Sequence, residues 1–342
     1  MEYTAAENTN KIIQAPAFLE FMPVSLFGSV MGFSALCFAW RSANRTWHYG
    51  AQFAEAIGYM AILTFVVLTI AYILKWIRYP ASVVREFKNS ATIGFFSTVS
   101  ISILLIPGIL LPYAPVVAYA IWLLGVVLTL FSAWYVLRKW LDEQQPRENA
   151  VPAWVLPVTG TLNVSIVGSA FKFAGAHEIC VLFFGIGIIF IIIMYSLIFS
   201  RLFFETPLPA AIQPSLFILV APMSLAFNGY EGMIGEQDLA ASTFFYFSLF
   251  LLLLFGSKLL LLPRCCPFQV SWWSVSFPLG AVTTAALRYA QMRPDAAHWT
   301  LAVLLLAVST FVVLYLLVQT IYQIGSRTFG RLPVGKPLQG LS

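Results

Sequence analysis

Long apolar runs separated by short polar segments are the main feature of this sequence. A helix that crosses the hydrocarbon core of a bilayer needs roughly 20 mostly apolar residues. Nine long stretches contain no Asp, Glu, Lys or Arg: 21–40, 56–74, 89–137, 149–171, 179–200, 206–230, 239–257, 265–287 and 296–326. The stretch 89–137 is long enough for two helices, and Pro112 and Pro115 in its middle are typical of a tight turn. The pattern therefore predicts ten transmembrane helices joined by short loops.

The composition agrees with this pattern and narrows the class of protein. The 342 residues are 60% hydrophobic and 10% charged, whereas a soluble globular domain has about 25% charged residues. This excludes a soluble enzyme, a nucleic-acid-binding module and a disordered chain. The unbroken runs also differ from the alternating polarity of a membrane-spanning barrel. We expect an all-α membrane protein with an N-terminal segment 1–20, one transmembrane domain 21–326 and a C-terminal tail 327–342.

Proline positions indicate a repeat within the transmembrane domain. Every second predicted helix, from the first to the ninth, holds a proline within or at the start of the span, and the helical parts between hold none. These prolines are Pro23, Pro107, Pro157, Pro222 and Pro278. Proline inside a helix removes a backbone hydrogen bond and kinks the chain, so such helices belong inside protein or along a water-filled cavity. The sequence therefore predicts five helical hairpins, with five Pro-kinked inner helices around a central pore.

Small polar residues are concentrated on the same five helices. Those that could line a pore are Ser25, Ser29, Ser100, Asn163 and Ser276. A second interpretation stays open for each of them, because small residues also let helices pack closely in membranes. For the set as a whole, enrichment on the proline-containing helices favours a lined conduit.

The cores of these five helices contain no charged residue. Ion-coupled transporters usually carry an ionisable residue near the membrane midplane. The nearest candidate is Glu55, close to the start of the second predicted helix, where a paired or interfacial carboxylate is the simpler interpretation. An uncharged pore lined by hydroxyl groups holds an anion weakly, with selectivity from helix dipoles and basic mouths. We therefore predict a pathway for small inorganic anions, although a neutral solute would also fit.

Basic residues are distributed unevenly between the two sides of the predicted helices. An even number of spans places both termini on one side, which carries 14 of the 19 basic residues. These are Lys11, Lys75, Arg78, Arg85, Lys88, Arg138, Lys139, Arg147, Arg201, Lys258, Arg264, Arg327, Arg331 and Lys336. By the positive-inside rule both termini lie in the cytoplasm, so we expect a multi-pass protein of the plasma (inner) membrane. The net charge of +5 reflects this topology and not nucleic-acid binding.

Motifs for enzymatic chemistry are absent from the sequence. It contains no Walker A, dinucleotide-binding, HExxH or GxSxG motif. We therefore expect neither an enzymatic activity nor a cofactor. The cysteines, Cys37, Cys180, Cys265 and Cys266, are interpreted as structural thiols. The histidines, His48, His177 and His298, follow predicted helices on the less basic side. They fit separate interfacial side chains, or a metal or pH-sensing cluster.

Four segments of the chain carry a family resemblance. They are Met22–Gly32 running into Ala35–Trp40, Glu86–Ser102, Pro152–Val158 and Ser271–Pro278. In this order on a ten-helix chain, they resemble parts of helices 1, 3, 5 and 9 of the tellurite-resistance/dicarboxylate-transporter (TehA-type) family, which includes the plant guard-cell slow anion channels. The resemblance covers roughly residues 20 to 325.

The resemblance implies a homotrimer in a lipid bilayer, with one pore in each protomer. It also implies that a helix-9 phenylalanine closes the pore and faces a small residue of helix 1. Phe277 and Gly28 match these positions, whereas Gly160–Asn163 departs from the family's usual Gly-Asn pair. Because Phe277 precedes Pro278, its backbone is biased away from α geometry.

Three functions follow from these observations. The leading hypothesis is a passive, gated channel for small monovalent anions of the chloride and nitrate class, occluded by Phe277. The second is a secondary carrier that exports an oxyanion or a C4-dicarboxylate. The third is a membrane sensor that does not transport. The weakness of this hypothesis is that the sequence shows no evident soluble output domain.

Overall fold

The computed structural model describes residues 18–236, 238–259 and 268–326, and every regular element in these ranges is a helix. The N-terminal residues 1–17, the pair Cys265 and Cys266, and the tail 327–342 lie outside the described residues. The expected all-α architecture is confirmed for the described part of the chain.

Five segments begin as a 3₁₀ helix and continue directly as an α-helix. They are η1 Val24–Leu26 with α2 Phe27–Trp47, η2 Ile93–Phe96 with α5 Ser97–Leu110, η4 Pro152–Val155 with α7 Leu156–Gly168, η5 Ala210–Val220 with α9 Ala221–Ile234, and η6 Val270–Val275 with α12 Ser276–Met292. Of these five 3₁₀ helices, η5 and η6 exceed the usual three or four residues. The recurrence of a 3₁₀ start at every second long helical segment supports an internal repeat.

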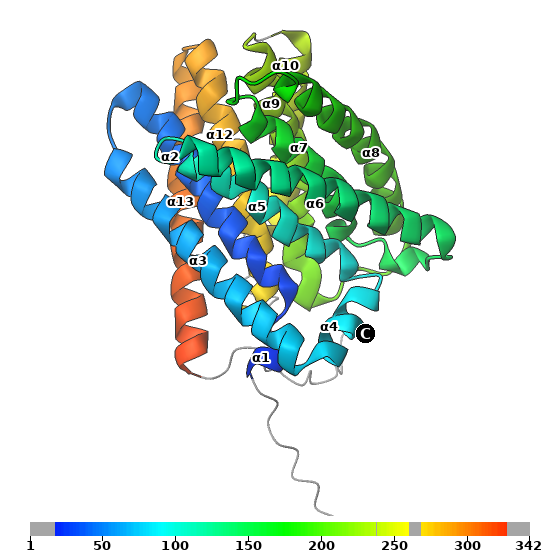
Figure 1. The fold of residues 1–342 in the computed structure, drawn as a ribbon. Coiled ribbons are helices and arrows are strands. Elements are labelled where there is room, and N and C mark those ends of the chain that lie inside the picture. The colour runs from blue at the N-terminus through cyan, green and yellow to red at the C-terminus, as the bar shows by residue number, and fades with distance from the viewer. Residues whose placement is uncertain (1–17, 237, 260–267, 327–342) are drawn as a thin grey trace, which may run out of the picture.

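Each of these five segments is followed by a long α-helix that packs against it. The long helices are α3 Ala51–Arg78, α6 Pro115–Asp142, α8 Ala176–Phe204, α10 Leu239–Leu259 and α13 Ala296–Gly325. The short elements α1 Phe18–Phe21 and α4 Pro80–Lys88 lie at one end of the bundle (bottom of Figure 1), and η3 Arg147–Asn149 follows α6. The turn predicted within 89–137 lies between α5 and α6.

The helices α2, α5, α7, α9 and α12 pack in a closed ring. Each contacts the next in this order, and α12 contacts α2 to complete the circle. Glycines allow the closing contact, because a Cβ built on Gly32 would lie 2.1 Å from the Ser276 Oγ and one on Gly280 would lie 2.7 Å from the Ala35 Cβ. Side chains at these two glycines would push α2 and α12 apart.

The ring segments have a larger fraction of buried residues than the long helices. In their most apolar stretches, the ring segments 24–47, 93–110 and 210–234 have 67–72% of residues buried, and the five long helices have 11–33%. Large apolar side chains are exposed along α3, α6, α8, α10 and α13. Within the described residues, eight helices are long and apolar enough to cross a membrane, and the ring segments 152–168 and 270–292 are not among them. The count of ten spans therefore stays a prediction.

The repeated prolines lie at different positions from those expected of interior kinks. Pro107 is inside α5, but Pro157 and Pro222 lie in the first two positions of their α-helices and Pro278 is the third residue of α12. Pro23 is the N-cap of η1. The helices α7, α9 and α12 each continue from a 3₁₀ turn whose carbonyl accepts from the first α-helical N–H, and proline, which has no N–H, follows one or two residues later. Three of the five prolines thus mark the change from 3₁₀ to α-helix.

Candidate functional site

Two cavities are lined by residues of all five ring helices. The larger, called the wide cavity, has a volume of about 460 Å³ and takes its lining from the later parts of these helices. The smaller, called the narrow cavity, has a volume of about 30 Å³ and takes its lining from the 3₁₀ segments and the first α-helical turns. A narrow cavity of this size holds about one water molecule.

A step of one helical turn separates the linings of the two cavities. On four ring helices, a residue of the narrow cavity is followed four positions later by a residue of the wide cavity. The pairs are Met31 and Ala35 on α2, Ile101 and Leu105 on α5, Thr159 and Asn163 on α7, and Ala221 and Leu225 on α9. Residues at i and i+4 lie above one another on the same helix face. The two cavities therefore follow one another along the axis of the ring.

On α12, Phe277 and Ala281 form a fifth such pair. Phe277 lines both cavities and is the one described residue that these two linings share. Its side chain is buried, with 6% of the residue exposed, and it is the second residue of α12. The ring of Phe277 therefore lies between the cavities.

Gly28 and Pro278 line the narrow cavity together with Phe277. The atom nearest to a Cβ built on Gly28 would be the Trp273 Cβ, at 3.8 Å. Gly28 thus has ordinary contact distance to its neighbour and lies on the narrow-cavity side of Phe277.

The polar residues predicted to line a pore divide into two groups. Ser25 lines the narrow cavity and Asn163 the wide one. The other hydroxyl groups donate to backbone carbonyls of their own helical segments and line neither cavity: Ser29 to Leu26, Ser100 to Ser97 and Ser276 to Trp273. For these three serines the structure favours the packing interpretation.

Charged residues in the wide cavity are mainly basic. Arg41, Arg45 and Arg288 line it, together with the single carboxylate of Glu231. Arg288 forms an ion pair with Glu231. Arg45 is exposed and has no hydrogen bond or ion pair with any described residue. The wall of this cavity therefore has an excess of positive charge.

Arg41 connects this wall to the ends of two other helices. It forms two hydrogen bonds with the Glu55 carboxylate of α3, at 2.8 and 2.7 Å, and Glu55 also accepts from the Tyr113 hydroxyl. Its guanidinium also donates to the carbonyls of Gly108 and Ile109 in the last turn of α5. These carbonyls lack intrahelical partners, and a cation stabilises this end of the helix dipole. Glu55 is therefore a paired carboxylate.

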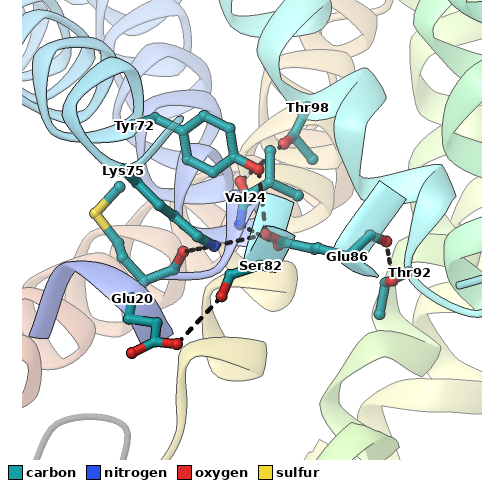
Figure 2. Close-up of polar contacts among 9 residues, drawn as sticks. Glu20, Val24, Tyr72, Lys75, Ser82, Glu86, Thr92 and Thr98 are labelled. Carbon is teal, nitrogen blue, oxygen red and sulfur yellow. Dashed lines mark hydrogen bonds and ion pairs between the residues drawn. The ribbon is translucent and has the colours of Figure 1, made fainter. Parts of the chain in front are cut away.

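The other end of the ring is fixed by a buried polar cluster around Glu86 of α4 (Figure 2). The Glu86 carboxylate accepts from the Val24 N–H at 2.7 Å, the Tyr72 hydroxyl at 3.1 Å and the Lys75 ammonium at 2.8 Å. Lys75, which is 3% exposed, also donates to the Met22 carbonyl. This cluster holds the first turn of η1 against α3 and α4.

The first α-helical turns of all five ring helices line the narrow cavity. Each continues from a 3₁₀ turn, whose carbonyl accepts from the first α-helical N–H. The positive ends of the five helix dipoles therefore point toward this half of the ring, whereas the guanidinium groups line the wide cavity.

The described cysteines and the histidines do not line either cavity. Cys37 and Cys180 are buried and unpaired. Within the described ranges, no group of three or more His, Cys, Asp or Glu side chains is arranged to hold a metal ion. His298 instead contacts Asp295 and the Tyr246 hydroxyl.

Sequence reasoning missed most of the polar wall of the wide cavity. Six of its lining residues were not singled out as site residues from the sequence: Arg41, Arg45, Asn228, Glu231, Arg288 and Gln291. One available signal was helical spacing, because positions 35, 38, 42 and 45 of α2 share a face and all line the cavity.

Comparisons with known proteins agree with the resemblance. The family model described as "Voltage-dependent anion channel" (SLAC1) matches residues 22–321. The chain is 24% identical over 315 residues to the S-type anion channel SLAH2 of Arabidopsis thaliana, which covers 89% of this chain and 59% of the relative. It is 24% identical over 319 residues to the guard cell S-type anion channel SLAC1 of the same plant, covering 90% and 56%. It is also 24% identical over 270 residues to a tellurite resistance protein TehA homolog of Haemophilus influenzae, covering 78% and 81%. The chain thus spans less than two thirds of the length of these plant relatives.

Proposed function

Because the chain belongs to the SLAC1 family of voltage-dependent anion channels, we propose that it is a passive channel for small monovalent anions such as chloride or nitrate. The pathway runs through the five-helix ring of each protomer and is closed by Phe277. The observation that carries this proposal is the position of Phe277, the one described residue that lines both the wide and the narrow cavity.

Charge supports anions over cations as the permeant species. Three arginines and one glutamate line the wide cavity, where Arg41 is paired with Glu55 and Arg288 with Glu231, and Arg45 has no ion-pair partner among the described residues. The first turns of five α-helices line the narrow cavity. Helix N-termini and basic clefts raise the local concentration of anions. Since no carboxylate among the described residues lines the narrow cavity, nothing in its wall binds a cation strongly.

The gate is tested by comparing two buried phenylalanines. Phe277→Ala should raise anion conductance in planar bilayers or oocytes, because the side chain between the cavities is removed. Phe227→Ala is the matched control, since Phe227 is fully buried and lines neither cavity. Unchanged conductance in Phe277→Ala, or an equal increase in both variants, would reject Phe277 as the gate.

A carrier that exports an oxyanion or C4-dicarboxylate is the second candidate. Its support is the size of the wide cavity, which lies within the range of about 300–1,000 Å³ typical of small-molecule sites. A carrier coupled to protons would accumulate substrate in liposomes under a pH gradient, whereas a channel would only equilibrate it. Reversal potentials and gradient-driven uptake distinguish the two.

The membrane arrangement is part of the same proposal. Ten spans, built as five hairpins, place both termini in the cytoplasm of a plasma (inner) membrane, with the basic segments around α4 on the cytoplasmic side. Cysteine labelling at position 82 in the α4 region and at position 295 between α12 and α13 should report opposite sides. The homotrimer rests on the family resemblance, and native mass spectrometry of the purified protein tests it.

A further inference from the structure

The lining of the narrow cavity repeats on all five ring helices with a spacing of three residues. Each residue that is followed four positions later by a wide-cavity residue is also preceded, three positions earlier, by another residue of the narrow cavity. The five pairs are Gly28 and Met31, Thr98 and Ile101, Leu156 and Thr159, Ile218 and Ala221, and Ser274 and Phe277. Residues three apart share a face of an α-helix and eclipse one another in a 3₁₀ helix. The wall of the narrow cavity therefore contains two layers of five residues, about one helical turn apart.

The layer next to the wide cavity, called the gate layer, is filled from one side. It consists of Met31, Ile101, Thr159, Ala221 and Phe277. Its three largest side chains come from α12, α2 and α5, which are neighbours in the ring. On the opposite side, α7 and α9 contribute only Thr159 and Ala221. Phe277 thus closes a layer whose other half has small side chains.

The second layer is filled from the other side. It consists of Gly28, Thr98, Leu156, Ile218 and Ser274. Its two large apolar side chains are Leu156 of α7 and Ile218 of η5, which continues into α9. They are 5% and 4% exposed. Because each layer is filled where the other has small side chains, a straight path along the axis of the ring meets large side chains twice.

Most hydroxyl groups of the narrow cavity are not available to a passing anion. Five Ser and Thr residues line it, and four of them donate to backbone carbonyls: Thr98, Thr159, Ser271 and Ser274. A hydroxyl group has one hydrogen to donate, and an anion only accepts. The cavity, with about 30 Å³, also holds only about one water molecule. An anion therefore loses most of its hydration here and finds few donors in exchange.

We propose that Leu156 and Ile218 form a second constriction, in series with Phe277, which limits the passage of anions once the gate is open. Apolar constrictions restrict channels by excluding water, and this one lies one turn from the gate. The inference rests on the proposed anion pathway and adds two residues to those that determine its conductance. Removing the Phe277 side chain opens the gate layer and leaves the second constriction in place.

Double variants in the Phe277→Ala background test this arrangement. Adding Ile218→Ala or Leu156→Ala should raise the chloride conductance of Phe277→Ala by at least about fivefold, because the remaining cost of dehydrating the anion falls. Adding Leu219→Ala is the matched control, since Leu219 is fully buried next to Ile218 and lines neither cavity.

Osmotic water permeability of proteoliposomes is the second readout for the same proteins. It should rise with Ile218→Ala and with Leu156→Ala but not with Leu219→Ala. Water responds to the width of the constriction whether or not an anion can cross. Where either alanine substitution prevents folding, Ile218→Val or Leu156→Val removes less volume and is measured in the same way.

The outcomes separate this inference from the proposed channel. The second constriction is wrong if Ile218→Ala and Leu156→Ala add nothing to the chloride conductance and water permeability of Phe277→Ala. It is also wrong if Leu219→Ala raises them equally. In both cases the channel stands as long as Phe277→Ala conducts chloride. If water permeability rises as expected but no variant passes chloride, the second constriction stands and the anion channel is wrong.

Discussion

Gly280 of α12 lies directly against Ala35 of α2, and a Cβ on Gly280 would be 2.7 Å from the Ala35 Cβ and 3.1 Å from its backbone carbon. These residues are 245 positions apart in sequence, and their contact closes the ring of five helices. Ala35 also lines the wide cavity one turn from Met31 in the narrow one. The close approach of α2 and α12 therefore lies beside the two cavities that Phe277 lines.

Gly280→Ala should destabilise the protein, because the added methyl group meets backbone as well as side chain. Overpacking of this kind costs about 1–3 kcal/mol. Gly185→Ala on α8 is the matched control, since a Cβ there meets nothing within 4 Å and alanine favours helix. The measurement is the thermal unfolding midpoint in detergent, which should fall for Gly280→Ala and stay level or rise for Gly185→Ala. Equal midpoints would show that α2 and α12 can separate freely.

Glu86→Gln should be strongly destabilising, because it leaves the buried ammonium of Lys75 without its counter-charge. Breaking a buried ion pair from one side costs about 3–5 kcal/mol. The double variant Lys75→Met/Glu86→Gln should be more stable than Glu86→Gln alone, since no buried charge remains.

The control for this pair is Arg138→Gln, because Arg138 and Asp142 are 63% and 65% exposed and their ion pair should contribute little. Denaturant titration of these three variants and the wild type measures the differences in stability. A Glu86→Gln protein as stable as the wild type would mean that Lys75 is solvated in spite of its burial.

If the positive charge of the wide cavity attracts anions, substitutions of Arg41 and of Glu55 should change the anion flux in opposite directions. Glu55→Gln leaves the Arg41 charge uncompensated and should raise flux, whereas Arg41→Gln should lower it. A unit charge at about 4 Å contributes about 1 kcal/mol even in water, so each change should be roughly fivefold. Chloride efflux from proteoliposomes measures both. Loss of pH-driven uptake in Glu55→Gln would instead favour the carrier.

Acid should weaken the start of α13. The backbone N–H of His298, and then its side chain, hold the pKa of the Asp295 carboxyl below its usual range. A lowered folded-state pKa stabilises the fold above the unfolded pKa of about 3.9, and this contribution is lost as pH falls through the folded value. Asp295→Asn keeps an N-cap acceptor but does not titrate. Its thermal unfolding midpoint should therefore fall less than that of the wild type between pH 6 and pH 3. If both midpoints fall equally with pH, Asp295 is not the group responsible.

The sequence predicted much of the fold because apolar length is a local property. The charge-free stretches coincide with the long helices, and Pro112 and Pro115 mark the turn between α5 and α6. Proline positions correctly identified the five ring helices. We expected these prolines to kink helix interiors, but most of them lie at or near helix starts. Pro157 and Pro222 mark the change from 3₁₀ to α-helix in the first turn, a distinction that a residue pattern does not carry.

The site was less accessible to sequence reasoning. Ser29, Ser100 and Ser276 have the composition of pore-lining residues, yet each donates to a carbonyl of its own helical segment. Asn163 was singled out, whereas Asn228 with the same unpartnered amide oxygen was not. The difference lies in which face of each helix meets the ring axis, and that depends on packing between helices far apart in the chain.

By itself, the sequence determined a helical membrane protein of this family, since hydropathy, the proline repeat and the four family segments are properties of contiguous residues. Only the tertiary structure shows that Phe277 lines both cavities. Its position between the two cavities exists because five helices, separated by loops and long return helices, close into a ring. The contact between α2 and α12, the first and last helices of the ring, joins segments that are far apart in the sequence. No local sequence pattern specifies this contact.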